Sequence, residues 1–193
     1  MNDHARMQKQ EVRQTLRAAR RALPVAQREH ETSATVTALW PLLWPQLQHD
    51  ACPLASYLAL SDELDLDALH RRWWSLAQVL WLPRVSGPGA LTWHPVSGPE
   101  LTIIGSYGIR EPDPARVPAA PLPADATVLV PGVGFTRTGQ RLGQGKGFYD
   151  RVLADHRGHT IGIAFACQVV EILPCEPHDQ RVAVVAAAGE LLR

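Results

Sequence analysis

A glycine-rich segment with two cationic side chains, residues 141–150, is the part of the sequence best suited to chemistry. Glycine occupies every second position from Gly143 to Gly147, and Arg141 and Lys146 flank or interrupt the run. Closely spaced glycines let backbone N–H groups approach a ligand, and the two cations add formal positive charge. A helix expected to begin at Phe148 would present its N-terminus to the same ligand. The segment therefore predicts a loop that binds phosphate or polyphosphate.

This segment fits neither standard phosphate-binding signature. A Walker A loop would need glycine where Gln140 stands, and Ser or Thr where Gly147 stands. A dinucleotide-binding fingerprint would need its third glycine at Phe148. A flexible surface turn is the alternative interpretation, and the flanking cations count against it.

The composition limits the kinds of partner that the protein attracts. Its 193 residues suffice for one good core, so we expect a single domain over residues 1–193. The 19 basic and 19 acidic residues give no net charge, so no overall field draws the chain to nucleic acid or anionic membranes. We expect a monomer that acts on a small molecule, with any anion site confined to a local patch.

The cysteines and the N-terminus indicate the compartment. Cys52, Cys167 and Cys175 are widely spaced and form no C-x-x-C pair, which argues against a disulfide framework or a zinc knuckle. The first ten residues contain charges and no apolar signal segment, and no apolar run reaches membrane-spanning length. We therefore expect a cytoplasmic protein with reduced thiols.

Lysine is rare in this sequence. There are 17 arginines but only two lysines, Lys9 and Lys146. An ammonium is a compact, mobile point charge, whereas a guanidinium is a planar fork. The presence of lysine at only these two positions suggests that both need an ammonium group. The alternative is that the two lysines are there by chance.

Strands and helices alternate along the hydrophobic pattern. Residues 126–131 form the clearest strand, because they are apolar on both faces, as in a central parallel strand. The other expected strands are 54–60, 78–82, 91–96, 160–165 and 182–186, and the expected helices are 5–23, 25–40, 61–74 and 148–155. Prolines between 105 and 125 argue against regular structure there. The pattern predicts an α/β fold with about six strands, mostly parallel, that binds ligands at the carboxyl ends of its strands.

Three carboxylates stand where they could serve such a site. Asp150, in the first turn of the helix at 148–155, could hold a metal ion that bridges phosphates, although complementing the helix dipole is the simpler interpretation. Asp179, in a late polar loop at residues 174–179, could supply a second ligand to the same ion. Glu63 follows an expected strand and could bind a donor group of a substrate, or complement a helix dipole. The eight histidines show no metal-binding spacing.

The segment from Pro131 to Arg151 resembles the signature of the 5-formyltetrahydrofolate cyclo-ligases, also called methenyltetrahydrofolate synthetases. Further segments resemble the family in the right order: Lys9–Arg13 with Arg21–Leu23, then Tyr57–Glu63, then Tyr107–Pro112. The resemblance implies a Rossmann-like layered α/β sheet with helices on both faces. It also implies an ATP- and Mg²⁺-dependent conversion of 5-formyltetrahydrofolate to 5,10-methenyltetrahydrofolate.

The resemblance also implies roles for individual residues. Those implied to bind ATP are Lys9, Arg13, Arg141, Leu142, Gly143, Gln144, Gly145, Lys146, Gly147, Phe148 and Tyr149. Those implied to bind the reduced folate are Tyr57, Glu63, Gln144, Gly145, Lys146, Gly147 and Phe148, with Glu63 accepting the paired N–H donors of the pterin. Lys146, Arg141 and Tyr149 would act in catalysis, and Asp150 and Asp179 would hold Mg²⁺.

The sequence departs from the family pattern at three positions, and two rival functions are alternatives. Phe148 stands where the family often has tyrosine, Val12 where leucine is usual, and Ala183 where many members place aspartate, so a relative with an altered substrate is an alternative. A phosphosugar isomerase or deaminase would need a similar loop. An RNA-binding module could use the basic face of the first helix, where Lys9, Arg13, Arg17 and Arg20 repeat about once per turn, but such a face is more often solvated.

Overall fold

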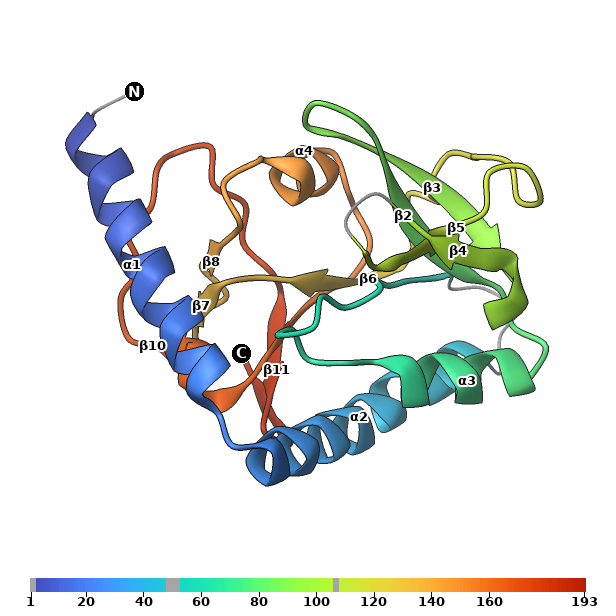
Figure 1. Ribbon diagram of the computed structural model, residues 1–193, viewed down its shortest axis with the longest axis horizontal. Coiled ribbons are helices and arrows are strands. Elements are labelled where there is room, and N and C mark those ends of the chain that lie inside the picture. The colour runs from blue at the N-terminus through green and yellow to red at the C-terminus, as the bar shows by residue number, and fades with distance from the viewer. Residues whose placement is uncertain (1–2, 48–52, 106–107) are drawn as a thin grey trace.

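A seven-stranded sheet forms the centre of the computed structural model, which describes residues 3–47, 53–105 and 108–193 (Figure 1). Its strands are β1 (Leu54–Ala55), β2 (Leu80–Gly87), β3 (Ala90–Val96), β6 (Thr127–Pro131), β9 (Thr160–Ala164), β11 (Val184–Ala187) and β12 (Glu190–Leu192). They lie in the order β12-β11-β9-β6-β1-β2-β3. The five central strands are parallel, while β3 and β12 pair antiparallel at the two edges.

The middle strand β6 separates two apolar layers. Val128 and Val130 belong to one buried cluster, whereas Leu129 belongs to the other. This division follows from the strand geometry, in which successive side chains point to opposite faces. The sheet is thus covered on both sides, as parallel sheets usually are.

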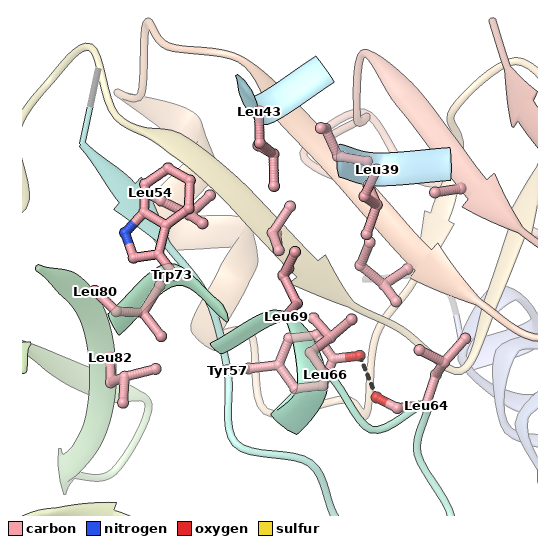
Figure 2. Close-up of a cluster of buried hydrophobic side chains, with 14 of the residues drawn as sticks. Leu39, Leu43, Leu54, Tyr57, Leu64, Leu66, Leu69, Trp73, Leu80 and Leu82 are labelled. Carbon is pink, nitrogen blue, oxygen red and sulfur yellow. Dashed lines mark hydrogen bonds between the residues drawn. The ribbon is translucent and has the colours of Figure 1, made fainter. Parts of the chain in front are cut away.

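Helices α2 (Val25–Leu47) and α3 (Asp67–Ser75) cover one face of the sheet (Figure 1). Figure 2 shows Leu39 and Leu43 of α2 and Leu69 and Trp73 of α3 in the cluster that contains Leu54 of β1. All five side chains are at most 2% exposed. Burying large apolar side chains of this kind contributes about 1.5–3 kcal/mol each, so this layer is a main source of stability.

Helix α4 (Phe148–Ala154) lies on the opposite face, where Leu153 packs in the cluster of Val128 and Val130. Helix α1 (Asp3–Ala22) lies at one end of the molecule, beside a small sheet of β7 (Gly134–Thr136), β8 (Arg141–Leu142) and β10 (Val169–Val170) (Figure 1). Leu16 of α1 is buried against Leu142 of β8. This packing brings the first helix against the start of the glycine-rich loop.

The predicted α/β class, mostly parallel sheet and layering are confirmed, while several boundaries are wrong. The strand expected at 54–60 ends at Ala55, because the next residues leave the sheet to line a cavity. Helix α2 continues past the predicted end at Trp40, since Leu39 and Leu43 are buried on either side of Pro41 and hold the helix in place. The hydrophobic pattern contains no clear signal for either change.

Three further expectations differ from the structure. Helix α3 begins at Asp67 and not at 61–65, where a turn places carboxylates against arginines of α1. The proline-rich segment contains strand β5 (Arg110–Pro112), which pairs with β4 (Thr102–Ile104). The edge strand β12 and the small sheet were not predicted, because strands of two or three residues carry little periodicity.

Two features of the sequence remain outside the structural description. Tyr107 and Cys52 lie outside the described residues. Within the described part of the chain, no helix has the length and apolar character needed to cross a membrane.

Candidate active site

Two adjoining cavities lie at the glycine-rich loop. The first has a volume of about 350 Å³ and is lined mainly by apolar side chains from the ends of β1 and β2, the β3 strand and the start of α4. Among its lining residues are Leu58, Leu60, Pro83, Phe148 and Tyr149. We call it the apolar cavity. Its position at the carboxyl ends of parallel strands is where an α/β sheet usually binds ligands.

Glu63 is the carboxylate that stands out in the apolar cavity. Its side chain is only 9% exposed. The Leu60 N–H donates to Oε2 at 3.1 Å, and Gln144 Nε2 donates to Oε1 at 3.3 Å. Burial raises the pKa of Glu63, and the Leu60 N–H and the charge of Arg20 oppose that rise. The site thus holds a desolvated acceptor suited to a ligand with paired N–H donors.

Two tyrosines lie near this carboxylate and play different parts. Tyr57 uses its hydroxyl to donate to the Leu64 carbonyl at 2.8 Å, so it is fixed in the core (Figure 2). The Tyr149 hydroxyl is buried and has no hydrogen-bond partner among the described residues. Burial raises the pKa of Tyr149, so its hydroxyl stays protonated at neutral pH. Tyr149 therefore has a hydrogen bond available for a ligand.

The second cavity, of about 500 Å³, is lined mostly by charged and polar groups, and we call it the polar cavity. Its lining includes Lys9 and Arg13 of α1, Asp150 of α4, and Glu176 and Asp179 of the late polar loop. Gly147 and Asp150 line both cavities. A ligand bound in one cavity would therefore meet a ligand bound in the other at this loop.

Each of the three carboxylates that line the polar cavity, Asp150, Glu176 and Asp179, has a cationic partner. Lys9 is only 5% exposed, and its ammonium donates to Glu176 at 2.7 Å and to Asp179 at 2.5 Å. Burial lowers the pKa of Lys9, but the bonds to Asp179 and Glu176 outweigh burial, and the pKa is raised overall. Arg141 donates to Asp150 at 2.6 Å. Both proposed metal ligands of the sequence analysis are thus held by cations.

The glycine-rich loop has the backbone conformation that its glycines predict. Gly145 and Gly147 have φ angles of +97° and +68°, in the region that other residues rarely adopt. The Arg13 guanidinium donates to the Gly143 carbonyl at 2.9 Å and fixes the loop to α1. Lys146 is exposed and lies in the lining of the apolar cavity.

The basic stripe of α1 faces the site and is not simply solvated. Lys9 binds the late polar loop, Arg13 binds Gly143, and Arg17 donates to the Gln144 side chain. Arg20 donates to Asp62 at 2.7 Å, next to Glu63. The sequence indicated that these four cations lie on one face of α1, because they repeat about once per helical turn. This spacing alone does not show whether that face points toward the site or toward solvent.

The predicted site residues are largely brought together. The apolar cavity is lined by Tyr57, Glu63, Arg141, Gly143, Gln144, Lys146, Gly147, Phe148, Tyr149 and Asp150, and the polar cavity by Lys9, Arg13, Gly145, Gly147, Asp150 and Asp179. Leu142 lines neither cavity and is buried against α1. Ala183 is exposed and also lies outside both linings. Sequence reasoning did not assign Arg17, Arg20 or Glu176 to the site.

Carboxylate oxygens are available for a hard divalent cation. Asp150 accepts from Arg141 through Oδ1, and Asp179 accepts from Lys9 and the Glu176 N–H through Oδ2, so these bonds engage one oxygen of each carboxylate. Glu176, His178 and Asp179 also place ligand atoms within 4.8 Å of one another. Oxygen ligands of this kind suit Mg²⁺, which binds through one or two carboxylates together with phosphate oxygens.

Comparisons with known proteins agree on one family. A sequence model described as the 5-formyltetrahydrofolate cyclo-ligase family matches residues 5–188. The 5-formyltetrahydrofolate cyclo-ligase of Escherichia coli (strain K12) is 32% identical in an alignment 172 positions long, which covers 85% of this chain and 91% of that protein. The enzyme of the same name from Mycolicibacterium smegmatis is 30% identical over 89% of each chain.

Solved structures give the same result. The NMR structure of Aquifex aeolicus 5,10-methenyltetrahydrofolate synthetase superposes with a TM-score of 0.77 at 30% identity, over 96% of this chain and 92% of that chain. A 5,10-methenyltetrahydrofolate synthetase from Mycoplasma pneumoniae shares the fold, with a TM-score of 0.68 at 21% identity over 92% and 97% of the two chains.

Proposed function

Because the chain belongs to the 5-formyltetrahydrofolate cyclo-ligase family and has that ligase activity, we propose that its two cavities hold the two substrates of the reaction. The reduced folate would occupy the apolar cavity and ATP the polar cavity. The reaction converts 5-formyltetrahydrofolate to 5,10-methenyltetrahydrofolate and releases ADP and phosphate.

The observation that carries this assignment is the shared lining at the loop. Gly147 and Asp150 line both cavities, so the γ-phosphate of ATP and the formyl group of the folate would meet there. Bringing two reactants together in the right orientation can account for much of the rate of a two-substrate reaction.

The chemistry follows from the poor leaving ability of an amide oxygen. The formyl oxygen attacks the γ-phosphorus, the bond from that phosphorus to the bridging oxygen breaks, and ADP departs. The resulting iminium phosphate is attacked by N10 of the same folate, N10 loses its proton to solvent, and the C–O bond to phosphate then breaks. Phosphorylation thus turns the formyl oxygen into a leaving group, and the attack by N10 closes the five-membered ring.

The residues at the loop have distinct proposed roles in this sequence. Lys146 places a mobile positive charge where charge develops on the transferred phosphoryl group, and backbone N–H groups of the loop assist it. Arg141 holds Asp150 at the junction of the cavities. Tyr149 donates its buried hydroxyl to the reacting part of the folate.

Glu63 would orient the folate by its pterin ring. A pterin presents paired N–H donors along one edge, and a carboxylate accepts two such bonds at once. The apolar walls, which include Phe148 and Leu60, would cover the ring faces. The folate is therefore held at one end by a charge and along its length by apolar contacts.

The polar cavity would bind the triphosphate by exchanging partners. Lys9 and Arg13 would turn from protein oxygens to phosphate oxygens, which would release Asp179 for Mg²⁺. Asp150 would offer Mg²⁺ the Oδ2 oxygen that its bond to Arg141 does not engage. Bound Mg²⁺ would neutralise phosphate charge and orient the phosphates. In this exchange the two carboxylates gain a divalent cation as the protein cations gain phosphates, so neither set of charges is left without a partner.

One assay tests the reaction on which the assignment of the two cavities depends. The protein is mixed with 5-formyltetrahydrofolate, ATP and Mg²⁺, and the ultraviolet absorbance of the methenyl product is followed together with ADP release. We expect one ADP per methenyltetrahydrofolate, with neither product formed when the folate is omitted. Absence of an ATP-dependent rise in absorbance, with the folded protein present, would contradict the proposal.

A further inference from the structure

We propose that Arg20, which lies outside both cavity linings, is a positioning residue that holds the Glu63 carboxylate ready for the reduced folate. The proposal rests on the proposed function, because it assigns a role to Arg20 through the folate site. Arg20 lines neither the apolar cavity nor the polar cavity. It acts from the C-terminal part of α1, about three turns away from Lys9.

The first observation is the placement of the guanidinium. The Arg20 side chain is 3% exposed, Nη2 donates to Asp62 Oδ2 at 2.7 Å, and Nη1 lies 3.9 Å from Glu63 Oε1. Asp62 and Glu63 are neighbours in the turn that follows Leu60. One buried planar group therefore spans two adjacent carboxylates and sets where the turn presents Glu63.

The second observation is that the backbone on both sides of the ion pair is held in place. Arg28 of α2 donates to the carbonyl of Arg20 at 2.8 Å and to the carbonyl of Asp62 at 3.1 Å. Its guanidinium also lies 5.1 Å from the centre of the Phe165 ring. Arg28 thus joins the two segments that carry the ion pair, and both partners are fixed by the backbone of α1 and the turn.

The third observation is that this arrangement is costly for stability alone. The Arg20 Nε is buried and has no hydrogen-bond partner among the described residues. Burial of a charged group with an unsatisfied donor disfavours folding, and buried ion pairs are often no better than apolar replacements. A role in holding Glu63 explains why an arginine occupies this place.

Among the charged groups near Glu63, Arg20 is the cation that favours its ionised form. Burial raises the pKa of Glu63, and Asp62 also disfavours its ionised form. The Leu60 N–H, Arg20 and Gln144 favour the carboxylate. The other titratable groups in the lining of the same cavity are Arg17, Tyr57, Arg110, Glu111, Arg141, Lys146, Tyr149 and Asp150.

Substrate binding would change these contacts unequally. Gln144 donates to Oε1 of Glu63 from the cavity side, at 3.3 Å, where a bound pterin would compete for the same oxygen. Arg20 approaches from α1 and outside the lining, so the folate does not displace it. Arg20, together with the Leu60 N–H, therefore supports the carboxylate both before and after the folate binds.

The test compares two arginines that contact the same aspartate. Arg21 lies 3.4 Å from Asp62 Oδ2, but its side chain is 70% exposed. We would measure the folate KM, the ATP KM and kcat for Arg20→Gln and Arg21→Gln between about pH 5.5 and 8.5. Arg20→Gln should raise the folate KM about tenfold at neutral pH, with the ATP KM changed less than about twofold. Arg21→Gln should leave all three values unchanged.

The pH profile separates a positioning role from a general loss of structure. Without Arg20, Glu63 takes up a proton more readily, so the ratio of variant to wild-type folate KM should grow as the pH falls. Adding Arg20→Gln to a Glu63→Gln protein should cause little further rise, because the supported carboxylate is already gone. A ratio that does not vary with pH, or equal increases in the KM of both substrates, would overturn the proposal.

A fallback variant keeps the test decisive if Arg20→Gln does not fold. Arg20→Lys retains the charge but loses the planar fork, so we expect about a threefold rise in folate KM with the ATP KM unchanged. No rise in folate KM would overturn the proposal. Absence of cyclo-ligase activity in the wild-type protein would instead overturn the proposed function, so the two failures are distinguishable.

Discussion

The two cavities at the glycine-rich loop differ in how their charged groups are paired before a ligand binds. In the polar cavity, Glu176 and Asp179 are paired with Lys9, and Asp150 is paired with Arg141, so its carboxylates have cationic partners before any ligand arrives. In the apolar cavity, Glu63 has a neutral donor on the cavity side, and burial raises its pKa. A charged ligand must exchange partners in the first cavity, whereas the second already presents a poorly solvated acceptor.

This difference suggests how each substrate would be recognised. Exchange of ion pairs suits a triphosphate with Mg²⁺, because it brings both negative and positive charge to a site that already contains both. A desolvated carboxylate among apolar side chains suits a flat ligand with a few N–H donors, since an analogue without those donors would leave Glu63 unpaired. The loop at Gly147 joins the two kinds of recognition.

The largest expected effect concerns the junction of the cavities. Lys146→Ala should lower kcat by about 10²–10³-fold, since its charge acts where the phosphoryl group is transferred. Because Lys146 is exposed, the free energy of unfolding should change by less than about 0.5 kcal/mol. Steady-state kinetics and chemical denaturation check both values. Parallel losses of activity and stability would mean that Lys146 is structural.

The next effect concerns the apolar cavity. Glu63→Gln should raise the folate KM by about 10- to 100-fold and leave the ATP KM within about twofold, because an amide offers one acceptor where the carboxylate offers two. The folded protein should be as stable as the wild type, since the substitution also removes the burial of an ionised group. An equal rise in the ATP KM would contradict separate recognition in the two cavities.

A substitution in the polar cavity should affect the KM for ATP and not the KM for the folate. Lys9→Met should raise the ATP KM about tenfold with little change in the folate KM, since Lys9 is assigned to the phosphates. It should also lower the melting temperature, because Glu176 and Asp179 lose their common cation. Lys9→Arg is the control: it restores the charge and should recover most of the stability, but less of the ATP affinity.

A smaller effect is expected from pH. The pKa of Glu63 is raised, so its carboxylate takes up a proton at a higher pH than an ordinary glutamate does. The folate KM should therefore rise as the pH falls toward that raised pKa, while Glu63→Gln should lack this part of the profile. A wild-type profile that matches that of Glu63→Gln would show that Glu63 does not titrate in the binding step.

The buried strands could be read from the sequence because each is apolar on both faces. Residues 126–131 are the clearest case, and β6 occupies them almost entirely. The apolar run at 54–60 was misleading, since Leu58 and Leu60 line a cavity rather than continue the strand. A hydrophobic residue that faces a ligand site and one that faces the core look the same in a sequence.

The site was predictable where it is continuous in the sequence and less so where it is assembled from distant parts. The loop from Arg141 to Tyr149 carried its own signal in glycines and cations. The contacts of Lys9 with Glu176 and of Arg20 with Asp62 join segments 167 and 42 residues apart, and only packing determines them. The spacing of the cations on α1 indicated that they share one face of the helix. It did not indicate that the packing of Leu16 against Leu142 would orient this face toward the site.

The most direct measurement is a pair of binding titrations on three proteins. Calorimetry would give the Kd for the reduced folate and, with Mg²⁺, the Kd for a non-hydrolysable ATP analogue for the wild type, Glu63→Gln and Lys9→Met. Two separate cavities that meet at the loop predict that Glu63→Gln weakens only folate binding and Lys9→Met weakens only nucleotide binding. If either variant weakened both ligands to the same extent while remaining folded, the assignment of one substrate to each cavity would be wrong.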